Sequence, residues 1–220
     1  MALERVRVTP EWALVAFAAA FAVFQHVPSA FGDAGDYVDL ATPFAVVGTT
    51  ALALASLRAA PAALALALLA GVLYIDGHGI HLAANSIGHE ELTGEAEDVT
   101  HFWDETFGHF WWHLGWMLLI GAIGAAEAFG RAARGVRPRS VWAAGATILL
   151  LGVTLFTSTV EGGTWWLALG AAAVIVVWAA LAPRPLLATL AGAFLLAALL
   201  IAIWAIWQGG MPQFSEVGWL

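Results

Sequence analysis

The residues best suited to chemistry in this sequence are its histidines, and six of the seven lie in one stretch of the chain. They fall in the segments GVLYIDGHGIHLAANSIGHEE and HFWDETFGHFWWHLGW, which also carry several carboxylates. The seventh, His26, comes after an earlier apolar run. Imidazoles and carboxylates together are typical of transition-metal sites and of general acid–base catalysis.

The spacing of these residues predicts two chemical stripes, each on one face of a helix. Residues three or four positions apart share a face, because each residue advances by about 100°. One face carries Tyr74, His78, His81, Asn85 and His89, and the other carries His101, Glu105, His109, His113 and Trp116. In a regular helix, Asp76 and Asp104 point away from these faces, and only a distorted helix would bring them in.

The two stripes should face each other at equal depth, because consecutive membrane helices run antiparallel. The expected neighbours are Asn85 with Glu105, His81 with His109, and His78 with His113. Small residues nearby, such as Gly77 and Gly79, allow close approach of a helix or a bound group. The sequence therefore predicts a column of imidazoles that descends from one face of the membrane.

A metal site is the first interpretation of this column. The spacings i, i+3 and i, i+4 allow two imidazoles of one helix to reach one ion. The predicted ligands are His78, His81, His109 and His113, and the groups expected beside them are Asn85, Tyr74 and Trp116. Nitrogen ligands favour zinc, iron or copper over magnesium or calcium, with zinc first. Whether His26, His89 and His101 join the site is left open.

The predicted function is that of a metal-dependent membrane hydrolase acting on a lipid or another amphiphile. Metal-activated water is a competent nucleophile, and Glu105 or Asp104 would move the proton. Alternatives are a haem or redox protein with axial histidines, a metal carrier or sensor, and a structural subunit in which the histidines only pack the helices. The oligomeric state is left open.

The composition requires a membrane environment for these stripes. Hydrophobic residues make up 61% of the chain and charged residues 11%, whereas a soluble domain carries about 25% charged residues. The apolar residues come in blocks of roughly the 20 residues that cross a bilayer as a helix. The expected fold is all-α, a single transmembrane bundle over residues 1–220. Its seven predicted spans are residues 12–27, 41–57, 61–87, 102–129, 141–159, 165–181 and 186–207.

The charges predict the orientation of these spans. All eight basic residues are arginines, and each falls on one side of a seven-span topology. Cytoplasmic loops collect arginine, so the amino terminus is expected in the cytoplasm and the carboxyl terminus outside. Most acids fall on the other side, and the net charge is −8. This predicts a multi-pass cell-membrane protein with lipid and a metal ion as partners and without nucleic acid. The absence of lysine excludes a retinal protein of the rhodopsin type.

Overall fold

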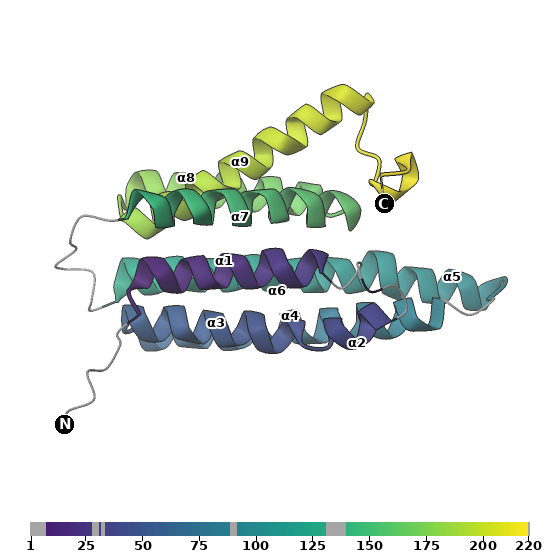
Figure 1. Cartoon of the computed structure of the whole chain (residues 1–220), viewed down its shortest axis with the longest axis horizontal. Coiled ribbons are helices and arrows are strands. Elements are labelled where there is room, and N and C mark those ends of the chain that lie inside the picture. Colours follow the sequence, from purple (N-terminus) through teal and green to yellow (C-terminus); the bar gives the residue numbers. More distant parts are fainter. Residues whose placement is uncertain (1–7, 28–30, 32–33, 89–91, 131–139, 220) are drawn as a thin grey trace.

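The chain folds into helices, which Figure 1 shows for the whole molecule. The computed structural model describes residues 8–27, 31, 34–88, 92–130 and 140–219, and these residues form no β-strand. The helices are α1 (Pro10–His26), α2 (Gly35–Asp39), α3 (Thr42–Leu57), α4 (Pro61–Gly88), α5 (Glu95–His101), the π-helix η2 (Phe102–Gly108), α6 (His109–Phe129), α7 (Val141–Glu161), α8 (Trp165–Leu181), α9 (Pro185–Gln208) and the 3₁₀-helix η4 (Ser215–Val217).

Five helical stretches in the described part of the chain are long and apolar enough to cross a membrane. They are Tyr37–Leu57, Pro61–Gly88, Glu95–Phe129, Val141–Glu161 and Pro185–Gln208. The helix α8 is also apolar but has 17 residues, the same length as α1. The prediction of an all-helical fold with several membrane-length helices is confirmed, and the count of seven spans stays a prediction.

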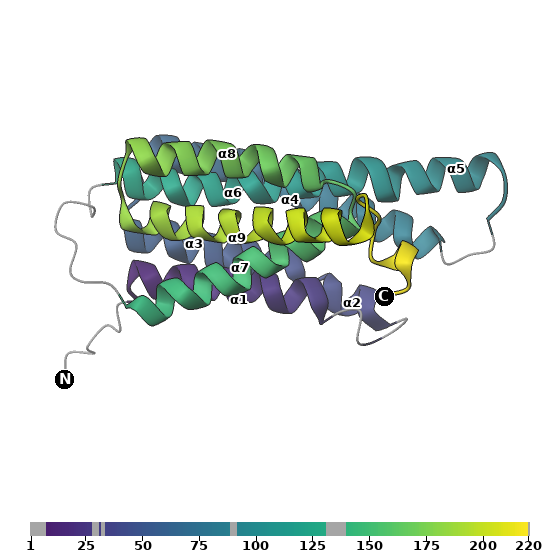
Figure 2. The same cartoon turned by 90° about the horizontal axis from the view of Figure 1, so that it is seen from above.

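The long helices form three layers (Figure 1). One outer layer contains α3 and α4, the middle layer α1 and α6, and the other outer layer α7, α8 and α9. The closest pairs are α4 with α6, α7 with α9, and α1 with α3. Figure 2, turned by 90°, shows α2, α5 and the carboxyl-terminal segment at one end of the bundle, and α5 projects beyond the other helices there.

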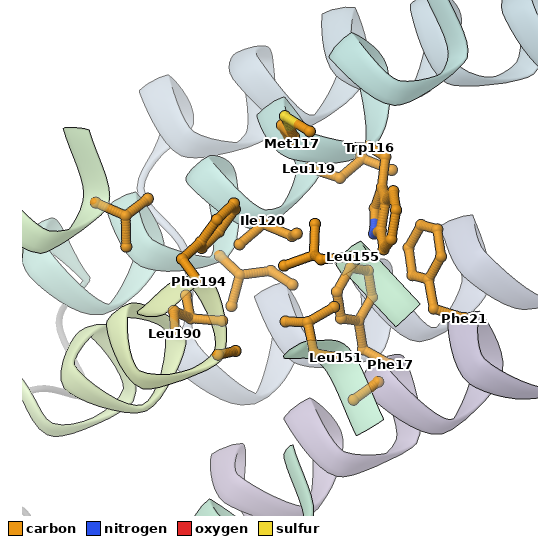
Figure 3. Close-up of a cluster of buried hydrophobic side chains, with 14 of the residues drawn as sticks. Phe17, Phe21, Trp116, Met117, Leu119, Ile120, Leu151, Leu155, Leu190 and Phe194 are labelled. Carbon is orange, nitrogen blue, oxygen red and sulfur yellow. The ribbon is translucent and has the colours of Figure 1, made fainter. Parts of the chain in front are cut away.

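The core between the layers is built from large apolar side chains of four helices (Figure 3). Phe17 and Phe21 come from α1, Trp116 and Ile120 from α6, Leu151 and Leu155 from α7, and Leu190 and Phe194 from α9. The rings of Phe21 and Trp116 stack with centroids 4.1 Å apart. This packing fixes the rotation of α6 and therefore the direction in which its histidines point.

Glycines bring α4 and α6 into direct backbone contact. A Cβ atom added at Gly77 would lie 2.2 Å from the backbone nitrogen of Trp112, and one at Gly115 would lie 2.3 Å from that of Tyr74. Small residues allow such close packing between membrane helices. The contact sets the relative height of the two helices that carry most of the histidines.

A buried carboxylate from α6 caps the first turn of α9. Glu127 is 2% exposed, and its two oxygens accept hydrogen bonds from the backbone N–H groups of Leu186 at 2.9 Å and Leu187 at 2.7 Å. The first N–H groups of a helix have no partner within the helix, and the helix dipole favours a negative charge there. Glu127 thus ties α9 to α6 at the end of the bundle opposite α5.

We expect Glu127→Ala to lower the free energy of unfolding by about 2 kcal/mol, because two buried N–H groups lose a charged acceptor. Thermal unfolding in detergent measures this loss. Glu97→Ala is the matched control, since Glu97 is exposed on α5. Equal stability of the two variants would contradict the capping role.

Candidate functional site

A π-helical segment places the first carboxylate of the site. Residues Phe102–Gly108 form a π-helix inside the long helix that starts at Glu95 and ends at Phe129. The wider turn changes the angular position of each residue, and such segments are frequent at functional sites. As a result Asp104 points toward α4, and its Oδ1 lies 2.5 Å from Nδ1 of His81. A regular helix would have turned Asp104 away.

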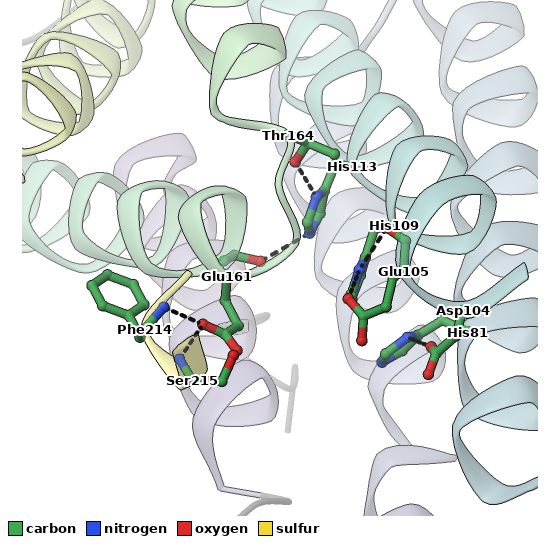
Figure 4. Close-up of polar contacts among 10 residues, drawn as sticks. His81, Asp104, Glu105, His109, His113, Glu161, Thr164, Phe214 and Ser215 are labelled. Carbon is green, nitrogen blue, oxygen red and sulfur yellow. Dashed lines mark hydrogen bonds and ion pairs between the residues drawn. The ribbon is translucent and has the colours of Figure 1, made fainter. Parts of the chain in front are cut away.

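A second carboxylate–imidazole pair lies directly beside the first. Nδ1 of His109 is 3.3 Å from Oε2 of Glu105, and it is equally far from the backbone oxygen of Glu105. The rings of His81 and His109 lie with centroids 4.4 Å apart (Figure 4). The predicted height match of these two histidines is therefore present in the structure. In both pairs Nδ1 faces the carboxylate, which leaves Nε2 of each ring for a ligand.

These pairs lie on the wall of a polar cavity of about 230 Å³. The cavity is lined by Phe24, Gln25, Asp39, His81, Glu105, His109, Trp112, His113, Ser158, Glu161 and Gly162. The lining residues come from α1, α2, α4, η2, α6 and α7 and from the turn after α7. Six helices therefore contribute residues to the site, and not only the two predicted helices that carry the histidine stripes.

Backbone from the turn after α7 closes one side of this cavity. A Cβ atom added at Gly162 would lie 2.7 Å from Cε1 of His113 and 3.0 Å from Cγ of His109. Any other residue at this position would push against both imidazoles. Gly162 therefore allows the turn to lie directly against the two rings.

His113 is held by two hydroxyl groups of other elements. Its Nδ1 lies 2.6 Å from Oγ1 of Thr164 (Figure 4). Its Nε2 lies 3.0 Å from Oγ of Ser158. Both ring nitrogens are therefore engaged, and the side chain is buried. His113 lines the cavity, but in this arrangement it has no nitrogen left for a metal ion.

His78 belongs to a separate contact behind the cavity. Its Nε2 lies 3.2 Å from Oδ2 of Asp39, a distance suited to an ion pair, although the angle is not that of a hydrogen bond. Thr42 donates to Oδ1 of the same carboxylate at 2.5 Å. The His78 ring meets the Trp112 indole edge to face at 5.0 Å. The structure therefore brings together His81, His109 and His113 at the cavity, with His78 outside it.

The other predicted site residues lie around the cavity rather than in it. Tyr74 and Trp116 are fully buried in the core next to Phe21, and neither lines the cavity. Asn85 is half-buried on α4, and it also does not line the cavity. None of the three is in a position to touch a ligand bound there.

Two further histidines that the structure describes, His26 and His101, are not among the cavity residues. His26 Nε2 lies 3.3 Å from Oγ1 of Thr157, and His101 is exposed on α5. His89 lies outside the described residues. Asp76 is exposed, as the helical phase predicts.

Two carboxylates of the site are missing from the sequence prediction. Asp39 lies on the short helix α2, and Glu161 is the last residue of α7. Oε2 of Glu161 accepts hydrogen bonds from the backbone N–H of Phe214 at 2.7 Å and of Ser215 at 3.2 Å (Figure 4). Glu161 thus joins the cavity to the carboxyl-terminal segment. Both residues stand at the predicted outer ends of spans, which was the only signal available in the sequence.

The site carries an excess of negative charge. Asp39, Glu105 and Glu161 line the cavity, and Asp104 lies directly behind His81. The arginines that the structure describes, Arg58 and Arg184, are not among the lining residues. Within the described part of the chain, only the histidines can therefore offset these charges, unless a cation binds.

No group of three or more His, Asp or Glu side chains in the described part of the chain is arranged to hold a metal ion directly. The four predicted ligands thus do not meet at one point in the structure. Comparisons of the chain with known protein families, with curated proteins and with solved structures found no match. The class that the fold and site define is a helical protein with membrane-length helices and a polar imidazole–carboxylate cavity.

Proposed function

We propose that the chain is a membrane enzyme that hydrolyses a lipid or another amphiphile at the outer face of the bilayer, with a divalent metal ion at His81 and His109. Zinc is the first choice of metal, with iron and copper as alternatives. The observation that carries the proposal is the pair of carboxylate–imidazole contacts, His81 with Asp104 and His109 with Glu105, on the wall of one cavity.

The orientation of Nδ1 supports ligation through Nε2. A metal-binding histidine almost always donates its other ring N–H to a carboxylate, a carbonyl or water, which fixes the ring and makes the free nitrogen more basic. His81 and His109 both have such a partner. The ring centroids of the two histidines lie 4.4 Å apart, so both imidazoles belong to the same part of the site.

The charge of the cavity supports a cation as well. Ionisable groups inside a membrane protein are costly unless they are paired or hydrated. Four carboxylates surround this cavity without a described arginine beside them. A divalent ion offsets two of these charges.

The chemistry follows from the groups around this ion. When bound, a divalent transition metal supplies a Lewis acid that makes water a nucleophile near neutral pH. Glu105 is half-buried on the cavity wall and can accept the proton of the attacking water. Asp104 holds His81 in place, and His113, fixed by Ser158 and Thr164, provides a rigid side of the pocket.

The seven-span topology is part of the proposal. Each of the seven predicted apolar segments coincides with a helix within a few residues, apart from the fourth, whose helix begins seven residues earlier at Glu95. The helices α1 and α8, with 17 residues each, reach about 25 Å and would thin the bilayer locally. The arginine pattern supports a cavity at the outer face and an amino terminus in the cytoplasm.

The haem alternative loses its main support. It requires the glycines between the two histidine stripes to admit a macrocycle, and Gly77 and Gly115 instead lie against the backbone of the opposite helix. A flat group of that size has no room between α4 and α6.

Metal analysis of the purified protein tests the proposal, together with a visible spectrum and an assay for hydrolysis of ester, amide and phosphodiester lipids in mixed micelles. We expect stoichiometric zinc, iron or copper and release of a hydrolysis product that a chelator stops. A Soret band would support haem instead. Protein that binds no metal after incubation with each ion would refute the proposal.

We expect Asp104→Asn to weaken metal binding by about 10- to 100-fold without abolishing it, because Asp104 orients a ligand rather than serving as one. Competition against a coloured chelator measures the affinity. Asp98→Asn is the matched control on the exposed surface of α5. An affinity equal to that of the control would contradict the orienting role of Asp104.

A further inference from the structure

A groove lies at the end of the molecule opposite the polar cavity. It has a volume of about 630 Å³ and is lined by Ala51, Leu54, Ala55, Arg58, Ala59, Ala60, Pro61, Leu64 and Phe129. These residues belong to the end of α3, the start of α4, the connection between them and the last residue of α6. All but one of the lining side chains are apolar.

The exception is Arg58, and its place in the chain is unusual. It is the C-cap of α3 with φ 50° and ψ 55°, the left-handed conformation, and among the described residues it is the only non-glycine with a positive φ. Glycine is the residue normally favoured at such a helix end, because a side chain there costs about 1 kcal/mol. Despite this strain, an arginine occupies the position, and its side chain lines the groove.

Among the residues that the structure describes, the guanidinium has no anionic partner. The described residues that line the groove include no carboxylate, and no described carboxylate forms an ion pair with Arg58. The side chain is exposed, as are Leu64 and Phe129 on the groove walls. In a bilayer, exposed apolar walls of this kind are covered by acyl chains, and the single cation adds a preference for a negatively charged headgroup.

We propose that this groove is a binding site for an anionic phospholipid, with an acyl chain along Ala51, Ala55 and Leu64 and the phosphate at Arg58. The volume falls in the range of small-ligand pockets. Basic positions between membrane helices are known to take anionic headgroups. This site is independent of the polar cavity and of the reaction proposed there.

Native mass spectrometry of the delipidated full-length protein tests the proposal. The protein is titrated with phosphatidylglycerol and with phosphatidylcholine of identical acyl chains. We expect phosphatidylglycerol to bind more tightly, and Arg58→Gln to weaken its binding about fivefold while leaving phosphatidylcholine unchanged. Arg184→Gln, the same charge change outside the groove, should have no effect.

A second variant tests the groove itself while keeping its charge. Ala55→Phe fills the exposed groove wall and should reduce the binding of phosphatidylglycerol, whereas Ala65→Phe, exposed on α4 outside the groove, should not. Equal affinity for the two lipids, or unchanged binding in both groove variants, would overturn the proposal. A dimer of the chain that forms in place of lipid adducts would overturn it as well.

Discussion

Replacement of His81 and His109 by alanine is expected to reduce bound metal from a stoichiometric amount to background. These are the two imidazoles whose Nδ1 atoms are held by carboxylates and whose rings lie 4.4 Å apart on the cavity wall. Loss of a ligand should exceed the roughly 10- to 100-fold effect of removing an orienting partner. Elemental analysis of the purified variants, with hydrolysis measured on the same samples, checks the result.

His101→Ala is the matched control for this experiment. It removes an imidazole from the long helix that also carries His109, but at an exposed position outside the cavity. We expect its metal content and activity to equal those of the unmodified protein. Full metal occupancy in the His81 and His109 variants would show that the ion is bound elsewhere.

Alanine at Gly77 or Gly115 is expected to lower the free energy of unfolding by about 3 kcal/mol. The added Cβ would lie 2.2 Å or 2.3 Å from backbone nitrogen of the opposite helix, and backbone cannot move aside as a flexible side chain can. The helices α4 and α6 must then separate, which also shifts His81 relative to His109. The temperature of thermal unfolding in detergent and the affinity for the metal ion should therefore fall together.

Gly79→Ala and Gly121→Ala serve as controls on the same two helices. An added Cβ at either position meets nothing within 4 Å. Alanine is also the better helix former, so these variants should be as stable as the parent or slightly more stable. If all four substitutions have the same effect, the glycines act through helix propensity and not through the contact between α4 and α6.

The helices and the facing histidines were predictable from local pattern. Apolar blocks of membrane length predict where helices lie, and the observed ends at Leu57, Leu181 and Phe129 coincide with the predicted ones. Helical periodicity places His81 and His109 on facing stripes, and the antiparallel connection between two consecutive helices sets their height. Both inferences use only residues that are near one another in the sequence.

The rest of the site depends on features that periodicity does not contain. The π-helix of Phe102–Gly108 redirects Asp104, and a regular 100° step predicts the opposite orientation. Asp39 and Glu161 enter the cavity from helices far apart in the chain, so only the packing of the bundle brings them there. The same holds for Ser158 and Thr164, which occupy the nitrogens of His113.

The spacing of the histidines along each helix predicts four ligands for one ion. Two imidazoles on one helix face can reach the same ion, but each also meets partners from other helices. His78 lies against Asp39, and His113 lies between two hydroxyls, so each is already engaged. The proposed centre therefore rests on one histidine from each of the two helices.

X-ray absorption spectroscopy of the metal-loaded protein tests this centre most directly, because the scattering pattern counts imidazole ligands around the ion. We expect two imidazoles with oxygen atoms completing the shell, and no bound metal to observe when His81 and His109 are both replaced. A shell made only of oxygen atoms, or an imidazole signal that survives the double replacement, would contradict a metal ion at this pair.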